Sequence, residues 1–311
     1  MTRVLLLLAL LAVGLVTLTT GDAPVSLSEV VASLTGQGDR ASDFIVLRLR
    51  LPRVLCAILV GAALGVAGAL LQSLTRNPLG SPEIVGLTSG SATGAICVMF
   101  FLHGGMTAIA LGAFLGGLLT ASVVYLLAIR RGGQLVLVGI GVSFVLVAVN
   151  HFLITRASVE EALVAQAWLV GGLNLRTWGQ VTAAGVGVAV LLPAAMLLWR
   201  RLTLMEMGDE IAQGLGVDVP RSRFLVLGTS VALAAVATAA AGPIGFVALA
   251  APQLARRLAP GVLAAALMGA LLLLASDLLV LRIFSVPLPV GIMTGAIGGL
   301  YLVWMLWRRT A

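Results

Sequence analysis

Residues 61–87 read GAALGVAGALLQSLTRNPLGSPEIVGL, a run of glycine, alanine and leucine followed by a proline-containing turn and a second apolar segment. Lipid tails offer no hydrophobic driving force between helices, so helices in a bilayer associate by close packing of small residues. This stretch therefore predicts an all-α, tightly packed membrane bundle. The same succession of helix, turn and apolar restart returns at 228–255. Two copies that begin on opposite sides of a membrane form an inverted repeat of the kind found in transporters.

The composition indicates a polytopic membrane protein. Of the 311 residues, 60% are hydrophobic and 10% are charged, and the mean hydropathy is +1.13. We expect one transmembrane domain over 1–311, with no soluble domain. Ten apolar runs have a length that crosses about 30 Å of hydrocarbon: near 3–20, 53–73, 84–102, 107–129, 135–154, 178–199, 222–241, 244–258, 261–280 and 289–307.

Three segments need a separate interpretation. Residues 162–175 are apolar but too short to span, which predicts a half-helix or re-entrant piece. The leucine-rich run at 3–20 resembles a secretory signal, but it lacks a small-x-small cleavage site and is interpreted as a membrane helix. The segment from about 21 to 50 carries several acids and is long enough for a short helix only.

All 19 basic residues are arginine, and the net charge is +7. These arginines flank apolar spans instead of forming one stripe, so binding to nucleic acid has little support and we expect no nucleic-acid partner. With both termini in the cytoplasm, twelve arginines fall inside and seven outside, which is the bias that cytoplasmic loops carry. The sequence therefore predicts a multi-pass protein of the bacterial cytoplasmic membrane with both termini cytoplasmic.

Few polar side chains could perform chemistry. Asp277 is the one acid placed clearly inside a span, so it is a functional candidate, or else a structural residue capped by backbone or paired with Arg282. The histidines, His103 and His151, cannot complete a zinc-protease pair or a Ser/His/Asp set. Cys56 and Cys97 lie inside apolar segments and are interpreted as packing residues. We expect no enzyme, no metal site and no cofactor bound by this chain.

The absence of lysine is informative. A phosphate-binding loop of the form G-x-x-x-x-G-K-[ST] requires a lysine, so this chain cannot contain one. Any transport driven by ATP must therefore be powered by another chain, with ATP and magnesium bound there.

Four ordered strings resemble a known family. RLRLPRVLCAILVGAALGVAGALLQSLTRNPLGSPEIVGL (48–87), LMEMGDEIAQGLGVDVPRSR (204–223), AGPIGFVALAAPQLARR (241–257) and LPVGIMTGAIGGLYL (288–302) are similar to the FecCD-type permeases. Members are the membrane subunits of bacterial ABC importers for ferric siderophores, haem and cobalamin. Within the family, RNPLGSP and EMGDEIAQGLGV favour a catecholate siderophore. Many relatives have Pro-His where this chain has Pro252 and Gln253.

The resemblance implies a type II importer permease fold and roles for three groups of residues. A coupling helix that seats in a groove of the ATP-binding subunit would span about 207–216, with Met205 among its apolar residues. The implied sites are Asn77, Pro78, Leu79, Gly132 and Gly133 for the inner gate; Met207, Gly208, Asp209, Glu210, Ile211, Gly214, Leu215 and Gly216 for coupling; and Arg50, Arg53 and Arg282 for docking of the binding protein.

The resemblance also implies partners. These are a second permease subunit (expected to be a paralogue in a heterodimer), two copies of an ATP-binding subunit, an extracytoplasmic substrate-binding protein and a ferric siderophore. Two alternatives stay open: a haem or cobalamin importer permease, and, from another class, an ion-coupled secondary transporter.

Overall fold

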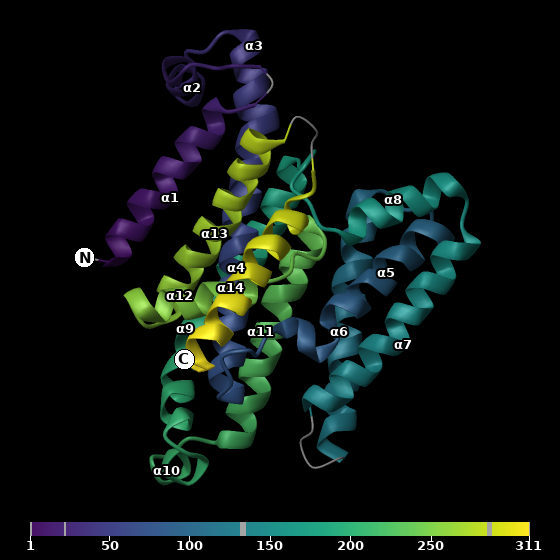
Figure 1. Ribbon diagram of the computed structural model, residues 1–311, viewed down its shortest axis with the longest axis vertical. Coiled ribbons are helices and arrows are strands. Elements are labelled where there is room, and N and C mark those ends of the chain that lie inside the picture. The colour runs from purple at the N-terminus through teal and green to yellow at the C-terminus, as the bar shows by residue number, and fades with distance from the viewer. Residues whose placement is uncertain (1, 22, 131–134, 285–287, 311) are drawn as a thin grey trace.

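The computed structural model describes residues 2–21, 23–130, 135–284 and 288–310, and in these ranges the chain contains helices and no strand. The long helices lie side by side, with α2 and α3 at one end of the molecule and α10 at the other (Figure 1). In chain order the elements are α1 (Thr2–Thr19), α2 (Leu27–Leu34), α3 (Arg40–Asp43), the π-helix η1 (Phe44–Arg50), α4 (Leu51–Thr75), the 3-10 helix η2 (Pro82–Val85), α5 (Leu87–Phe101), α6 (Met106–Arg130), α7 (Leu135–Arg156), α8 (Val159–Leu169), α9 (Trp178–Glu206), α10 (Asp209–Gly214), α11 (Val219–Ala241), α12 (Val247–Leu258), α13 (Val262–Ile283) and α14 (Val290–Thr310).

Helix α4 is the centre of the bundle and packs on α9, α11, α12 and α13. The small residues predicted to bring helices together lie at these contacts. A Cβ on Gly65 would overlap the Ala265 carbonyl oxygen of α13, and a Cβ on Gly68 would overlap the Ala248 carbonyl oxygen of α12. Helices α5 and α6 meet in the same way through Gly94. Because the backbones touch at these points, the predicted close-packed bundle is confirmed.

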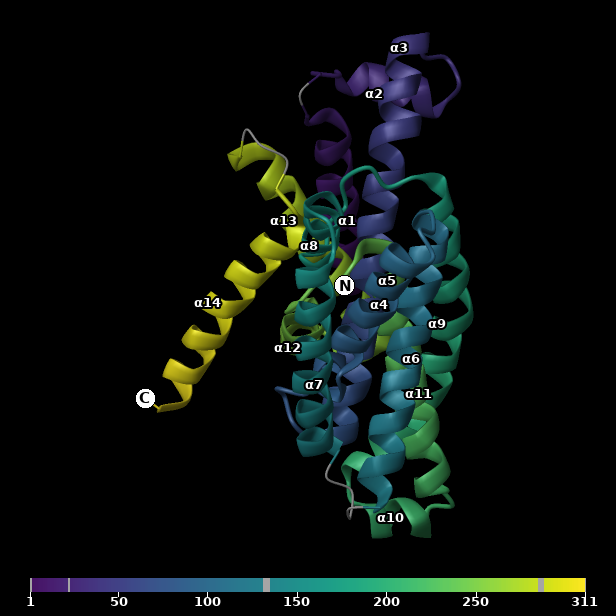
Figure 2. The same cartoon turned by 90° about the vertical axis from the view of Figure 1, so that its right-hand side faces the viewer.

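The predicted number of ten spans is only partly matched. In the described ranges, seven helices are long and apolar enough to cross a membrane, and α5 and α14 form shorter apolar stretches. The span expected at 244–258 is shorter, because α12 has 12 residues and begins only after Phe246. The half-helix expected at 162–175 is α8, which ends at Leu169. Figure 2 shows α14 leaning away from the other helices.

The second predicted span begins much earlier than expected. The sequence predicted its start at residue 53, whereas α3, η1 and α4 form one continuous 36-residue helix from Arg40 to Thr75. Pro52 does not interrupt it, because it lies in the first turn of α4, directly after the wider π-helical turns of η1. A proline there loses no hydrogen bond that the regular α-helix needs.

The two copies of the internal repeat run in opposite directions. Helix α4 runs toward the α10 end and α11 runs away from it (Figures 1 and 2). Each copy is interrupted after its long helix, at Gly86 in the first and at Gly242 in the second, and both glycines have a positive φ. The interruptions meet, because the Phe246 backbone N–H donates to the Glu83 carboxylate. One backbone N–H at the second break is therefore satisfied inside the bundle by a side chain from the first.

Candidate functional site

The acidic stretch that interrupts the apolar sequence forms the short helix α10. Gly208 precedes it with φ 122°, and Gly216 follows it with φ 84°. Residues with a side chain rarely adopt these backbone angles, so both turns favour glycine. Asp209 and Glu210 occupy the first turn, as predicted, where the helix dipole favours negative charge. Of the two glycines expected to end the helix, Gly216 takes the left-handed conformation, whereas Gly214 is the last helical residue.

Helix α10 has one apolar face that its own chain does not cover. Met207, Ile211 and Leu215 are 62%, 51% and 59% exposed. Met205, which the resemblance grouped with them, is instead buried, in a cluster with Ala212, Val217, Val219 and the partly buried Leu74 of α4. The prediction for Met205 is wrong because that side chain belongs to the last turn of α9, which faces inward. The other face of α10 is therefore buried, through Ala212, in this separate apolar cluster.

A charged cluster joins α10 to the ends of α4 and α11. The Asp209 carboxylate accepts from Arg76 Nη2 at 3.0 Å through one oxygen and from Arg223 Nη2 at 2.5 Å through the other. Arg76 also donates to the Met205 carbonyl oxygen. Both arginines are half exposed. Asp209 is thus held by two guanidinium groups that come from different helices.

The inner turn, defined as Asn77–Leu79, directly follows Arg76. Asn77 N donates to the Gln72 carbonyl oxygen at 3.1 Å, which closes the end of α4. The Asn77 side chain accepts from the Leu79 backbone N–H at 2.9 Å, and Gly80 N donates to the Asn77 carbonyl at 3.0 Å. The turn is therefore braced internally, with Leu79 exposed at its tip.

A second contact ties the inner turn to the C-terminal part of the chain. Gln253 Nε2 of α12 donates to the Pro78 carbonyl oxygen at 2.6 Å, and Tyr301 Oη of α14 donates to Gln253 Oε1 at 3.1 Å. Sequence reasoning marked Gln253 only as a departure from the Pro-His pair of relatives and gave Tyr301 no role. A single glutamine in an apolar helix has no spacing that reveals its partners.

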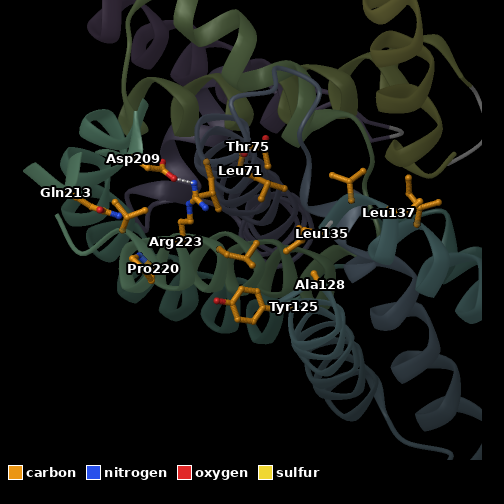
Figure 3. A pocket seen from close by; sticks show the side chains of 15 residues that line it. Leu71, Thr75, Tyr125, Ala128, Leu135, Leu137, Asp209, Gln213, Pro220 and Arg223 are labelled. Carbon is orange, nitrogen blue, oxygen red and sulfur yellow. Dashed lines mark hydrogen bonds and ion pairs between the residues drawn. The ribbon is translucent and has the colours of Figure 1, made fainter. Parts of the chain in front are cut away.

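A cavity of about 1010 Å³ opens beside this cluster, lined by α4, α6, α7, α10 and α11. Asp209 and Gln213 lie on one side of it and Leu137 of α7 on the other, with Arg223 bonded to Asp209 at its edge (Figure 3). Tyr125 of α6 lies along its floor in this view. The cavity therefore separates α10 from the beginning of α7. The predicted gate residues Gly132 and Gly133 lie outside the described residues.

The arginines predicted to dock a binding protein lie near the α2–α3 end. Arg53 forms two hydrogen bonds of 2.8 Å with the fully buried Asp277, so Asp277 pairs with Arg53 and not with Arg282. Arg50 donates to the backbone carbonyls of Leu18 and Ala23, and Arg282 Nη2 donates to the Thr20 hydroxyl at 3.2 Å. Because Arg53 pairs with a fully buried carboxylate, its charge is satisfied within the bundle, and its side chain is 18% exposed.

Asn150 and His151 lie in α7, Cys56 lies in α4 and Cys97 lies in α5. Asn150 is buried, accepts from the Thr93 hydroxyl and donates to the Ser89 carbonyl, whereas its neighbour His151 is exposed. Cys56 and Cys97 are free thiols. In the described ranges no three His, Cys, Asp or Glu side chains gather as metal ligands would.

The sequence and the structure were compared with known proteins. The FecCD transport family matches residues 7–308. The chain is 46% identical to the ferric enterobactin transport system permease protein FepG of Escherichia coli (strain K12), over 98% of this chain and 95% of the relative. It is 38% identical to the Fe(3+)-citrate import system permease protein YfmE of Bacillus subtilis (strain 168), over 97% of this chain and 92% of the relative.

A solved structure supports the same likeness. It is described as an inward-facing conformation of a metal-chelate type ABC transporter, and it superposes with a TM-score of 0.89 at 28% identity. The superposition covers 98% of each chain. The helical arrangement described above is therefore that of an ABC transporter membrane subunit.

Proposed function

Because the chain belongs to the FecCD transport family, we propose that it forms one half of the membrane pathway of an ATP-driven importer for a ferric siderophore. The observation that carries the proposal is the near full-length identity of 46% to a ferric enterobactin permease. The resemblance predicted from RNPLGSP and EMGDEIAQGLGV is thereby confirmed, and a catecholate siderophore is the favoured cargo. The chain is a transporter subunit and not an enzyme.

The exposed face of α10 supplies a physical means of using ATP. Met207, Ile211 and Leu215 present apolar area at the end of the molecule, on a helix that is too short to span a membrane. Such a face is suited to a groove on a soluble partner, and methionine adapts well to an irregular groove. Since the chain has no lysine for a phosphate loop, the proposed partner is the ATP-binding subunit, which holds ATP and magnesium.

The full assembly follows from this assignment. Two permease subunits, of which the second is a paralogue, enclose the pathway. Two ATP-binding subunits bind them, one on the coupling helix of each permease subunit. An extracytoplasmic binding protein delivers the siderophore. In the proposed topology ten helices, including α5, α12 and α14, cross or enter the cytoplasmic membrane as an inverted repeat. Both termini and α10 lie on the cytoplasmic side, and α2 and α3 lie outside.

Two further sites are proposed by position. The inner turn, Asn77–Leu79, together with Gly132 and Gly133, forms the inner gate. Arg50 and Arg282 form the docking face for acids of the binding protein, since the arginine fork binds carboxylates and does not lose its charge. Arg53 serves this face indirectly, because its pair with Asp277 holds the beginning of α4 in place.

The test is reconstitution of the chain with its second permease and ATP-binding subunit in vesicles that receive the loaded binding protein. We expect uptake of ferric enterobactin that needs ATP and exceeds uptake of haem and of cobalamin. The control omits ATP and imposes a proton or sodium gradient. Uptake driven by the gradient alone would establish the secondary-transporter alternative, and preferred uptake of haem or cobalamin would change the cargo.

A further inference from the structure

The first residue of α10 is bonded to the last residue before the inner turn. Asp209 begins α10, and Arg76 is the residue at which α4 ends, one position before Asn77. Their side chains meet at 3.0 Å and are 35% and 49% exposed. The ion pair is therefore a direct side-chain link between α10 and the residue that precedes the turn, without an intervening helix.

The turn is built to pass such a displacement on. Arg76 has left-handed backbone angles, φ 48° and ψ 31°, which an arginine adopts only when its surroundings fix it. The hydrogen bonds of Asn77 with Leu79 and Gly80 hold the following residues together. On its other side the same turn is held by Gln253 through the Pro78 carbonyl oxygen. The turn is thus held from two sides, by α10 through Arg76 and by α12 through Gln253.

Within the described residues of α10 (Asp209–Gly214) and α7 (Leu135–Arg156), no hydrogen bond or ion pair joins the two helices. Helix α10 packs on α9 and α11, and the cavity of about 1010 Å³ lies between it and the first residues of α7 (Figure 3). Helix α10 also contacts α4 through the apolar cluster, in which Leu74 packs against Ala212 and its neighbours. The apolar contact has no preferred direction, whereas the ion pair joins Asp209 to one particular side chain, that of Arg76.

We propose that Arg76 is a positioning residue that transmits the movement of α10 to the inner turn, an inference that rests on the proposed function of both elements. Arg223 provides a contrast within the same cluster. It bonds to the other oxygen of Asp209 but belongs to α11, so it anchors α10 without touching the turn. Two arginines on one carboxylate thus have different tasks, which makes them a matched pair for experiment.

The experiment compares Arg76→Gln, Arg76→Lys and Arg223→Gln in the reconstituted complex, with siderophore imported per ATP hydrolysed as the measurement. A half-exposed ion pair contributes up to about 1 kcal/mol, so we expect Arg76→Gln to lower the ratio about three- to fivefold. Arg76→Lys keeps the charge and should recover at least half of the wild-type ratio. Arg223→Gln should stay within about twofold of wild type, because its bond anchors α10 but does not reach the inner turn.

A second measurement follows the turn itself. Leu79→Cys is placed in a background with Cys56→Ala and Cys97→Ala, and its thiol labelling rate is compared with and without trapped nucleotide. We expect the rate to change with nucleotide when Arg76 is present and to be constant in Arg76→Gln. Equal labelling behaviour and an equal transport ratio in Arg76→Gln would overturn the proposal, as would an equal loss in Arg223→Gln.

Assembly is checked separately. Asp209→Asn weakens the bonds to both arginines from the α10 side. Because the Arg223 bond does not reach the turn, this variant should reproduce Arg76→Gln while the ATP-binding subunit still co-purifies. Loss of that subunit in both variants would make the contact an assembly contact and overturn the transmission role. Failure of the wild-type complex to import siderophore with ATP would instead refute the proposed function, so the two failures are distinguishable.

Discussion

Arg53 holds Asp277 in two hydrogen bonds of 2.8 Å each, which join the first turn of α4 to the last turns of α13. The carboxylate is fully buried and the arginine side chain is 18% exposed. Removal of one partner from a buried pair leaves an uncompensated charge, which costs about 3–5 kcal/mol. The pair therefore stabilises the contact between α4 and α13, although Arg53 was a candidate for docking and Asp277 for membrane chemistry.

The first prediction concerns this pair. Arg53→Gln and Asp277→Asn should each lower the unfolding free energy of the detergent-purified chain by about 3 kcal/mol, and the thermal unfolding temperature should fall with it. The double change Arg53→Met with Asp277→Leu should recover much of the loss, because neither charge is then left unpaired. Arg282→Gln, an exposed residue on the same face, is the matched control and should unfold as wild type does. Single variants as stable as this control would contradict the structural role.

The turn at Gly216 gives the second prediction. Gly216→Val should weaken α10 by about 1–3 kcal/mol, because valine is strained at φ 84°. Gly214→Ala is the control: its Cβ would meet nothing within 4 Å, and alanine favours the helix. Limited proteolysis across 207–218 should be faster in Gly216→Val and unchanged in Gly214→Ala. Equal proteolysis rates for the two variants would show that the left-handed turn does not hold α10.

The exposed face of α10 gives the third prediction. Ile211→Asp places a charge in the proposed interface while leaving the fold intact, since Ile211 is half exposed in this chain. Burying an unpaired charge is costly, so the ATP-binding subunit should no longer co-purify. The control is Gln213→Glu, which adds a charge to the same helix at an exposed position that lines the cavity, and which should retain the subunit. Retention of the subunit at wild-type level in Ile211→Asp would remove this face from the interface.

The bond between α12 and the inner turn gives the fourth prediction. Gln253→Leu leaves the Pro78 carbonyl and the Tyr301 hydroxyl without their partner, at a cost of about 1–3 kcal/mol for a buried polar group. The Leu79→Cys labelling rate should rise in this variant. Tyr301→Phe removes only the outer bond and should have the smaller effect. A labelling rate that is unchanged in Gln253→Leu would show that the turn is held by its internal bonds alone.

The outer face gives the fifth prediction. Arg282→Glu should slow association of the binding protein at low salt, with a smaller effect on dissociation, because an exposed rim charge acts mainly by steering. Association rates at two salt concentrations test this, since high salt should remove the difference. Arg156→Glu, an arginine at the end of α7, serves as the control for the change of charge. A rate for Arg282→Glu that equals wild type at both salt concentrations would exclude the docking role.

Local signals carried much of the fold. The run predicted at 261–280 is α13 (Val262–Ile283), and the acids and glycines at 207–216 predicted α10, because caps, charges and apolar length act over a few residues. The glycines of α4 likewise indicated close contact between helix backbones, which the structure shows at Gly65 and Gly68. Family membership likewise followed from ordered motifs along the chain.

Contacts between distant residues could not be predicted. Arg50 and Arg53 were predicted to dock the binding protein, at the start of a span expected from residue 53, whereas one helix runs through both of them from Arg40. Their charges are compatible with that because Asp277, 224 positions away, and the backbone at Leu18 and Ala23 accept their bonds. The inward direction of Met205 and the link from Gln253 to Pro78 depend on packing in the same way.

The central position of α4 also constrains the biogenesis of the protein. In its most apolar stretch 78% of the residues are buried, yet α9, α11, α12 and α13, which bury it, are all synthesised later. When α4 enters the membrane, its glycine grooves and Arg53 face lipid or early neighbours, and Asp277 is still more than two hundred residues from being translated. The nascent chain must therefore hold an inserted but unassembled first half, and the bundle closes around α4 only as the last helices arrive.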